Sequence, residues 1–199
     1  MSGNAERLAP VMLTGRFVRL EPLSLAHLDD FCAVGLDPDL WRWIPSSVAT
    51  RDEMRCYIET ALREQEAGLW LPFAVIYLES GRAIGSTRYG NISLPNRRVE
   101  IGWTWYGKAF QRTSVNTECK LLLLTHAFER LGMIRIEFKT DALNEKSRNA
   151  LQRIGAVEEG IFRKHLICES GRIRDTVYFS ILDREWPEKK HRLEAALNW

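Results

Sequence analysis

The segment of the sequence best suited to bind an anion is residues 107–117, which read Gly-Lys-Ala-Phe-Gln-Arg-Thr-Ser-Val-Asn-Thr. An alternating stretch ends just before it and a strongly apolar stretch with helical periodicity follows, so a helix is expected to begin within it. The first N–H groups of a helix have no partner inside the helix, and with the positive end of the helix dipole they favour phosphate. Arg112 would add charge, and further donors would come from Ser114, Asn116 and Thr117. The alternative is that Thr113 or Ser114 only caps the helix.

A second polar stretch, Asn144-Glu145-Lys146-Ser147, follows an alternating segment that ends at Asp141. A short helical pattern follows it and stops at Gly155. Asn144 and Ser147 would offer an amide and a hydroxyl to a ligand at this helix start. The same two side chains are also good helix caps, so the stretch alone does not establish a site.

The strand pattern over residues 98–106 places one carboxylate, Glu100, in a position to accept a proton. Alternation predicts an apolar face opposite Glu100 that is made by Val99, Ile101, Trp103 and Trp105. A carboxylate can act as general base toward an amine, directly or through water. The alternative is an ion pair between Glu100 and a neighbouring arginine. By residue type His126 and His165 are further candidates for the base, although His126 falls in the apolar helix and is expected to be structural.

Three tryptophans are candidates to line a substrate pocket. Trp41 and Trp43 lie on a loop bounded by Pro38 and Pro45, and Trp70 precedes an apolar strand. Aromatic side chains bury a large area and contact aliphatic amines well. Core packing is the alternative for each of them, and the loop position favours Trp41 and Trp43 because function concentrates on loops.

The elements that must position these residues follow the order strand, two helices, three strands, helix, strand, helix, two strands. The strands are expected near residues 15–21, 73–78, 83–89, 98–106, 134–139, 161–167 and 173–182, and the helices near 24–32, 50–68, 115–131 and 144–154. Because a buried helix joins two strands, one connection is a crossover and the sheet is mixed. The predicted fold class is α+β or mixed α/β. The expected division is a loose leader at 1–14, one domain at 15–186 and a charged, helical tail at 187–199.

Composition and charge exclude several classes of protein. With 45% hydrophobic and 27% charged residues, the chain of 199 residues is typical of a globular protein and unlike a disordered one. A formal net charge of +2 gives no sign of a nucleic-acid surface. The four cysteines show no spacing typical of a metal site. The first residues lack the apolar core of a signal peptide and no aliphatic run is long enough to cross a membrane, so we expect a cytoplasmic protein without metal, nucleic-acid or membrane partners.

Five segments, taken together and in this order, resemble the GNAT superfamily of acetyl-CoA-dependent N-acetyltransferases, and within it the RimJ/RimL-type branch. They are residues 15–23 (Gly-Arg-Phe-Val-Arg-Leu-Glu-Pro-Leu), the loop 37–45 that ends Trp-Arg-Trp-Ile-Pro, Glu-Ile-Gly-Trp at 100–103, the turn and helix start at 107–117, and Asn-Glu-Lys-Ser at 144–147 with its closing Arg-Ile-Gly-Ala. The resemblance spans nearly the whole chain, roughly residues 15–186.

This resemblance implies a mixed, mostly antiparallel sheet of seven strands flanked by about four helices. It implies acetyl-CoA as acetyl donor and a primary amine as acceptor, either a protein N-terminus or a small amine, with direct attack in a ternary complex. Carried to this sequence, it makes Glu100 the candidate base and Ser147 the candidate proton donor to the leaving sulfur. The residues expected to contact the cofactor are Trp103, Thr104, Trp105, Gln111, Arg112, Thr113, Ser114, Val115, Asn116, Thr117, Asn144 and Ser147. Those expected at the acceptor are Trp41, Trp43 and Trp70.

Two departures from the family pattern bear on function. The pyrophosphate turn of the family usually reads Gln/Arg-x-x-Gly-x-Gly/Ala, but Ser114 and Asn116 occupy both small-residue positions here. Many members place a tyrosine seven residues after the Asn of the later helix to protonate the thiolate, and Leu151 stands there in this chain. These departures motivate an alternative function, a CoA-binding regulatory or interaction module with little or no turnover. The acceptor and the oligomeric state stay open, and a homodimer is compatible with the sequence.

Overall fold

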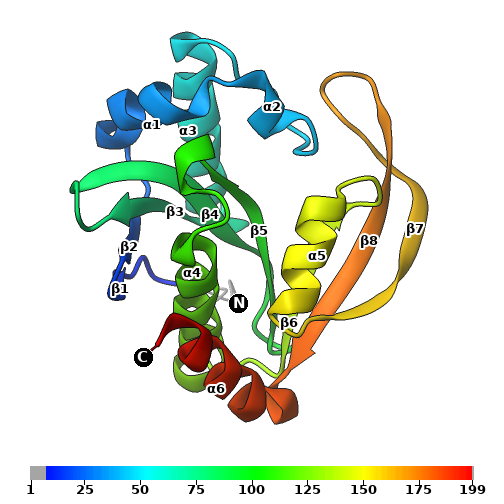
Figure 1. Cartoon of the computed structure of the whole chain (residues 1–199). Helices are drawn as coiled ribbons and strands as arrows, with labels where there is room; N and C mark the ends of the chain where they lie inside the picture. Colours follow the sequence, from blue (N-terminus) through cyan, green and yellow to red (C-terminus); the bar gives the residue numbers. More distant parts are fainter. Residues whose placement is uncertain (1–7, 199) are drawn as a thin grey trace, which may run out of the picture.

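One open sheet of eight strands organises the chain, in the order β1-β2-β3-β4-β5-β6-β8-β7 (Figure 1). The computed structural model describes residues 8–198. The strands are β1 Leu13–Thr14, β2 Val18–Pro22, β3 Trp70–Tyr77, β4 Arg82–Ser93, β5 Arg98–Tyr106, β6 Arg135–Asp141, β7 Val157–Ile167 and β8 Ile173–Leu182. The helices are α1 Leu28–Gly35, α2 Pro38–Trp41, α3 Arg51–Glu66, α4 Ser114–Thr125, α5 Glu145–Arg153 and α6 Trp186–Leu197.

The mixed α/β class expected from the sequence is confirmed, with eight strands in place of seven and six helices in place of about four. The extra strand, β1, pairs with β2 through Leu13 and Leu20, so the end of the expected loose leader joins the sheet. Residues 1–7 of that leader and residue 199 of the expected tail lie outside the described residues. Within residues 8–198, no helix combines the length and the apolar character that a membrane crossing requires.

Helices cover both faces of the sheet and form two separate cores. On one face, which we call the α4 face, Val99 and Ile101 of β5 pack in the same core as Cys119 and Leu123 of α4. On the other, the α3 face, the buried side chains of the core include Phe31, Trp41, Met54, Tyr57 and Trp105. Helices α4, α5 and α6 lie together on the near side of the sheet in Figure 1. Side chains on the two faces of β5 therefore belong to different environments.

The only parallel pair of neighbouring strands in the described chain, β5 and β6, stays together for a short distance. Their register pairs Arg98 with Arg135, Val99 with Ile136, and Glu100 with Glu137. Beyond these three pairs β5 continues to Tyr106 and β6 to Asp141 without pairing with each other, although β5 stays paired with β4 and β6 with β8. We call the region between residues 101–106 of β5 and residues 138–141 of β6 the wedge. In the wedge, the edge of β5 that faces β6 and the edge of β6 that faces β5 form no ladder with each other.

Strand β5 does not alternate as the sequence pattern predicted. Ser86 pairs with Trp105 and Arg88 with Gly102, so β5 carries one more residue than β4 between these pairs. The extra residue is a β-bulge, and it coincides with Trp103, whose φ of 49° lies in the left-handed region. One inserted residue moves every later side chain to the other face. The prediction that Trp103 and Trp105 share a face with Val99 and Ile101 is therefore wrong.

A buried carboxylate on α4 fixes the start of β2. Glu118 is fully enclosed, and its two oxygens accept the backbone N–H groups of Arg16, Phe17 and Val18, each at 2.7 Å. The approach is close enough that a Cβ on Gly15 would lie 2.5 Å from the carboxyl carbon of Glu118. Glycine at this position is therefore required by space, and the first long strand is attached to the helix that borders the wedge.

We predict that Glu118→Gln strongly destabilises the protein. An amide presents only one acceptor to three converging N–H donors, and its own N–H₂ group opposes one of them, so the expected loss is about 3 kcal/mol of unfolding free energy. Urea unfolding followed by circular dichroism measures this loss. Glu188→Gln, which removes the same charge from an exposed position on α6, is the control and should stay within about 0.5 kcal/mol of wild type. Equal stability of Glu118→Gln and wild type would refute this role.

Candidate active site

The turn before α4 has the geometry of a capped helix start. The Thr113 hydroxyl accepts the N–H of Val115 at 3.3 Å and donates to the Phe110 carbonyl at 2.7 Å, so Thr113 is the N-cap and Ser114 the first helical residue. The chain reverses at Arg112, whose φ is 61°. Ser114 and Asn116 are helical, so the absence of glycine at these two positions puts no strain on the backbone.

The side chains around this turn are already engaged with one another. Gln111 donates through Nε2 to the carbonyl of Tyr106 at 3.1 Å, and the Tyr106 hydroxyl donates to Oδ1 of Asn116 at 3.3 Å. Lys146 Nζ donates to Oε1 of Gln111 at 3.2 Å. This last bond joins the turn before α4 to the first turn of α5, so the two polar stretches singled out in the sequence lie side by side.

Helix α5 begins at the cap that its sequence indicated. Asn144 is the N-cap, and its Oδ1 accepts the N–H of Ser147 at 3.1 Å. The capping interpretation therefore holds for Asn144. It leaves the hydroxyl of Ser147, which is partly exposed, in the first turn of α5 beside the turn before α4.

Glu100 lies on the α3 face where β5 and β6 begin to separate. It is 2% exposed, and its Oε2 accepts hydrogen bonds from Asn91 Nδ2 at 2.6 Å and from Lys139 Nζ at 2.7 Å. The ion pair is thus with a lysine of β6 and not with an arginine. Burial alone would lower the pKa of Lys139, but the charge and the hydrogen bond of Glu100 outweigh it and raise that pKa. The carboxylate of Glu100 is therefore held by a buried ion pair and one further hydrogen bond.

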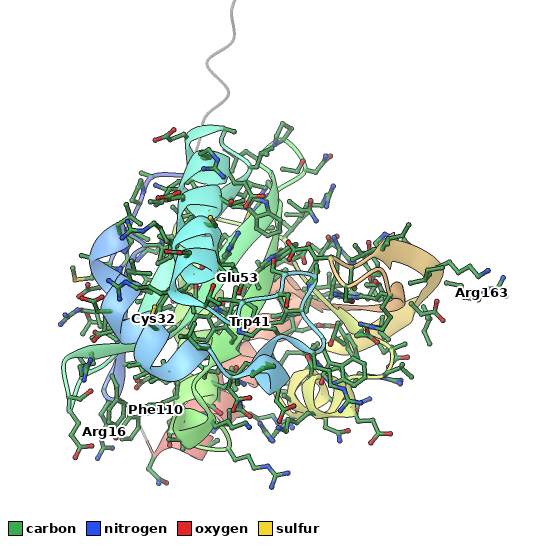
Figure 2. All side chains as sticks on the ribbon, turned by 90° about the horizontal axis from the view of Figure 1, so that it is seen from above. Arg16, Cys32, Trp41, Glu53, Phe110 and Arg163 are labelled. Atoms are coloured by element: carbon green, nitrogen blue, oxygen red, sulfur yellow. The ribbon has the colours of Figure 1, made fainter. Side chains whose placement is uncertain are left out.

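An aromatic row on β7 and β8 continues from this ion pair. Lys139 Nζ lies 5.0 Å from the ring centroid of Tyr178. Tyr178 in turn contacts Phe162 at 4.3 Å between centroids, and its hydroxyl lies 3.4 Å from Nε2 of His165. His165, the alternative base, is therefore on the same face as Glu100. Its neighbour Arg163 projects far from the body of the molecule in Figure 2.

The three predicted acceptor tryptophans occupy different environments. Trp41 is buried in the α3-face core, where its Nε1 donates to the Gly35 carbonyl at 2.7 Å. Trp43 is partly exposed, and Trp70 packs edge-to-face on Trp103 at 4.3 Å between centroids. The structure therefore separates Trp41 from the other two and leaves Trp43 and Trp70 at accessible positions.

The loop that carries Trp43 crosses to the other half of the sheet. In this crossing loop, residues 42–49, the Pro45 carbonyl accepts the N–H of Glu169 at 3.1 Å and Ser47 N–H donates to the Glu169 carboxylate at 2.8 Å. The guanidinium of Arg172 lies 5.2 Å from the ring centroid of Trp43. The crossing loop thus ties the segment before α3 to the β7–β8 turn and borders the wedge.

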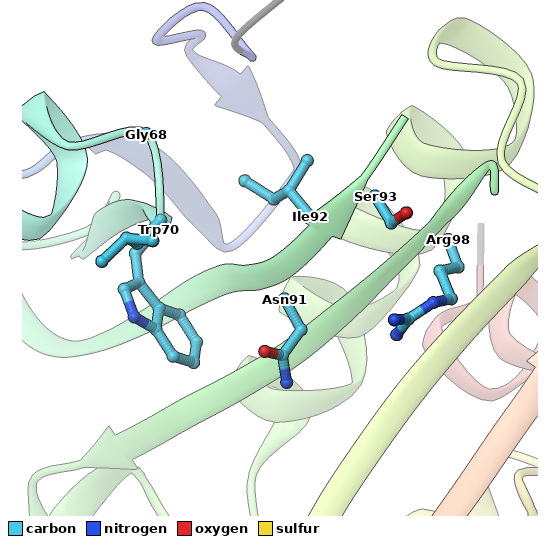
Figure 3. A pocket seen from close by; sticks show the side chains of 7 residues that line it. Gly68, Trp70, Asn91, Ile92, Ser93 and Arg98 are labelled. Carbon is cyan, nitrogen blue, oxygen red and sulfur yellow. The ribbon is translucent and has the colours of Figure 1, made fainter. Parts of the chain in front are cut away.

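A shallow pocket of about 450 Å³ lies beside Glu100. Its lining includes Trp70, Asn91, Ile92, Ser93 and Arg98. In Figure 3, Trp70, Asn91 and Arg98 extend to the same side of the strands. Asn91 links the pocket to Glu100 through its 2.6 Å hydrogen bond. Nothing in the sequence pattern indicated Asn91, because its partner is set by the pairing of β4 with β5.

Lys120 is a second buried cation that sequence reasoning did not assign to the site. It is 5% exposed on the α4 face, donates from Nζ to the Thr104 hydroxyl at 3.0 Å, and lies 6.0 Å from the ring centroid of Phe138 on β6. Thr104 in turn shares a 2.8 Å hydrogen bond with Thr87. Lys120 therefore lies under the wedge, where burial lowers its pKa to about 8.

Comparison with known proteins gives a consistent result. Residues 18–157 match the family model of the acetyltransferase (GNAT) domain. A Bacillus subtilis strain 168 protein with the provisional name ribosomal N-acetyltransferase YdaF is 34% identical over 151 residues, which cover 75% of this chain and 80% of that protein. The crystal structure of a GCN5-related N-acetyltransferase from Brucella melitensis aligns with a TM-score of 0.88 and 34% identity, covering 96% of this chain and 86% of that chain.

A more distant structure shares the fold. Mycobacterium smegmatis RimJ in complex with CoA-disulfide aligns with a TM-score of 0.81 and 24% identity, covering 94% of this chain and 95% of that chain. The chain belongs to the GNAT acetyltransferase family, as expected, and is accordingly a transferase; the similarities to YdaF and RimJ are consistent with the expected RimJ/RimL-type branch. Among residues 8–198 there is no group of three or more His, Cys, Asp or Glu side chains that could hold a metal ion.

We predict that Lys120→Met is more stable than wild type at pH 7 and that its advantage falls as the pH rises. Between about pH 8 and the ordinary value of 10.5 the unfolded lysine holds a proton that the folded one has released, so wild type gains stability across this range. The gain is limited to about 3 kcal/mol. Melting temperatures measured from pH 7 to 10.5 test this, and a variant that is less stable at every pH by a constant amount would contradict it.

Proposed function

We propose that this chain transfers an acetyl group from acetyl-CoA to a primary amine, by direct attack of the amine within a ternary complex. The observation that carries the proposal is the separation of β5 from β6 after Glu100. It leaves strand edges with unused N–H and C=O groups beside two helix starts, and it places a buried carboxylate where the separation begins. An extended thioester arm and an amine could approach one another in such a wedge from its two sides.

The residues around the start of α4 fit a pyrophosphate group. The first N–H groups of a helix favour an anion, and Arg112 and Lys146 add positive charge close by. Unpaired backbone groups of residues 101–106 suit an amide-containing arm, which binds as an additional strand would. The RimJ structure with CoA-disulfide, which has the same fold, supports CoA as a ligand.

The residues on the α3 face suit the removal of a proton from the amine. A free amine such as that of lysine has a pKa near 10.4 and must lose a proton before it can attack. We assign Glu100 as the acceptor of this proton, through water, because its Oε2 is held by Asn91 and Lys139. His165 is the alternative base on the same face.

Two further groups would act on the thioester that acetyl-CoA supplies. The bulge at Trp103 turns backbone N–H groups of β5 out of the ladder, and a strand N–H that points into the wedge can stabilise a developing oxyanion. Ser147, in the first turn of α5, would donate a hydrogen bond to the departing sulfur. Ser147 would thereby take over the role of the tyrosine that many family members carry at the position of Leu151. The name of the relative YdaF favours a protein N-terminus over a small amine as the acceptor.

The first test is the binding of CoA. Ligand at about 100 times its Kd should stabilise the protein by roughly 2.7 kcal/mol and raise its melting temperature. Ser114→Leu should abolish this shift, because a bulky side chain at the first helical position blocks an anion from the backbone N–H groups. Thr60→Leu, which makes a comparable change at an exposed position of α3, should keep it. No shift for wild type at millimolar CoA, or an unchanged shift for Ser114→Leu, would contradict the assignment.

The second test concerns proton removal. General base catalysis contributes about 10²- to 10⁴-fold, so Glu100→Gln should lower kcat/KM by about that factor while the CoA melting shift is retained. Raising the pH should partly restore the rate, since more of the amine is then neutral. Glu137→Gln is the control, because Glu137 is also buried, lies opposite Glu100 on β6 and pairs with Arg98 and Arg135. If Glu100→Gln keeps more than about a third of wild-type kcat/KM, Glu100 is a structural partner of Lys139.

A further inference from the structure

Arg174 on β8 is a buried arginine without a partner. Its side chain is 6% exposed, and its Nε is fully enclosed with no hydrogen-bond partner. Across the described residues, the side chain of Arg174 forms no hydrogen bond or ion pair. Of the guanidinium nitrogens only Nε is enclosed in this way, so the two terminal nitrogens are the ones that a ligand can reach. Buried guanidinium groups in proteins are normally paired, which makes this one unusual.

A second unpartnered group lies beside it. The hydroxyl of Thr176 is buried and has no hydrogen-bond partner in the described structure. Arg174, Thr176 and Tyr178 alternate along β8 and therefore share one face. That face is the α3 face, because Tyr178 contacts Lys139, which pairs with Glu100. An unpaired cation and an unpaired hydroxyl thus lie on the α3 face of β8, on the same side of the sheet as Glu100. We call this surface, formed by Arg174, Thr176 and Tyr178 of β8 and by Lys139 and Asp141 of β6, the wall.

The acidic groups near Arg174 are committed to other partners. Asp141 accepts from Arg172 at 2.6 Å through Oδ2 and from the Leu143 N–H at 2.9 Å through Oδ1. Glu100 is held by Lys139 and Asn91. The negative charges of Asp141 and Glu100 act on Arg174, but neither carboxylate bonds to it, and burial still lowers its pKa. Arginine nevertheless stays charged.

The charge count on this wall favours a ligand with a single negative charge. Three cations, Lys139, Arg172 and Arg174, lie with two carboxylates, those of Glu100 and Asp141, whereas the nearby charges of Glu137 and Glu159 are offset by Arg98 and Arg135. One positive charge is therefore left over. A planar guanidinium binds a carboxylate through two parallel hydrogen bonds, and a hydroxyl can add a third. A phosphate dianion would exceed the available charge and would approach the two carboxylates.

We propose that Arg174 and Thr176 bind a carboxylate of the amine acceptor, so that this enzyme prefers acceptors with an acidic group near the amine. The inference rests on the proposed acetyl transfer and adds the substrate class to it. Cα atoms of Arg174 and Tyr178 are about 13 Å apart along an extended strand. With the amine at Glu100, this spacing suits an acidic side chain at the second or third position of a peptide better than a group on the amine-bearing carbon itself.

The preference is tested with matched acceptors that differ only in charge. Ser-Asp-Ala-Ala is compared with Ser-Asn-Ala-Ala, and Ser-Ala-Asp-Ala with Ser-Ala-Asn-Ala, in assays of kcat/KM. A hydrogen-bonded charge pair of this kind should favour the acidic member of at least one pair by about 10- to 100-fold. A third pair, β-alanine and β-alaninamide, distinguishes a small amino acid from a peptide as the source of the carboxylate. Equal kcat/KM within all three pairs would overturn the proposal.

Variants assign the preference to these residues. Arg174→Gln should reduce the acid-to-amide ratio to about one through loss of the acidic substrate alone, with the CoA melting shift unchanged. Arg163→Gln removes the same charge from an exposed position on β7 and should leave the ratio as in wild type. If Arg174→Gln does not fold, Thr176→Val serves in its place, and it should lower the ratio several-fold. An acid-to-amide ratio of kcat/KM that is unchanged in Arg174→Gln would overturn the assignment. If only Thr176→Val folds, an unchanged ratio in that variant would overturn it.

A binding measurement separates this inference from the proposed function. Calorimetry with the N-acetylated forms of the same peptides, in the presence of CoA, requires no turnover. Tighter binding of the acidic product by wild type, lost in Arg174→Gln, would support the carboxylate site even if no acetyl transfer is detected. Equal binding of acidic and amide products by wild type would refute the site, whether or not the enzyme transfers acetyl groups.

Discussion

The short pairing between β5 and β6 is the constraint on which the rest of the site depends. Only three residue pairs join the two strands before they separate. A bulge at Trp103 begins just beyond the last of these pairs, and it moves Trp105 onto the α3 face. The helices that follow the two strands, α4 and α5, start beside one another and are linked by the bond from Lys146 to Gln111. Sheet topology thus assembles the wedge and its two helix starts together.

The two faces of the wedge carry different charged groups, and in the proposed function they have different roles. On the α4 face the buried Lys120 is held by Thr104 under the strands. On the α3 face Glu100 and Lys139 form a buried pair, and Arg174 remains unpaired further along the same wall. A buried charge without a partner destabilises a folded protein. The unpaired positive charge of Arg174 is therefore more readily explained by binding of a ligand than by a contribution to stability. In the proposed function, the α4 face is the CoA side of the wedge and the α3 face is the acceptor side.

Much of the fold and part of the site could be predicted from the sequence. The strand and helix patterns gave the class, and the caps at Thr113 and Asn144 lie where their side-chain types indicated. The bulge could not be predicted, because an alternating pattern shows no sign of one extra residue at Trp103. The partners of Glu100 were also missed, since they depend on the pairing of three different strands. Local patterns specify elements, whereas long-range register specifies which side chains meet.

Acceptor-dependent cleavage of the thioester is the measurement that tests the central claim most directly. Release of CoA from acetyl-CoA would be followed with a panel of N-terminal peptides, polyamines and amino sugars, and the products would be checked by mass spectrometry. The account predicts release that depends on one class of amine and yields the acetylated amine in equal amount. Tight binding of CoA without release in the presence of any amine would contradict it, and would instead favour a CoA-binding module without turnover.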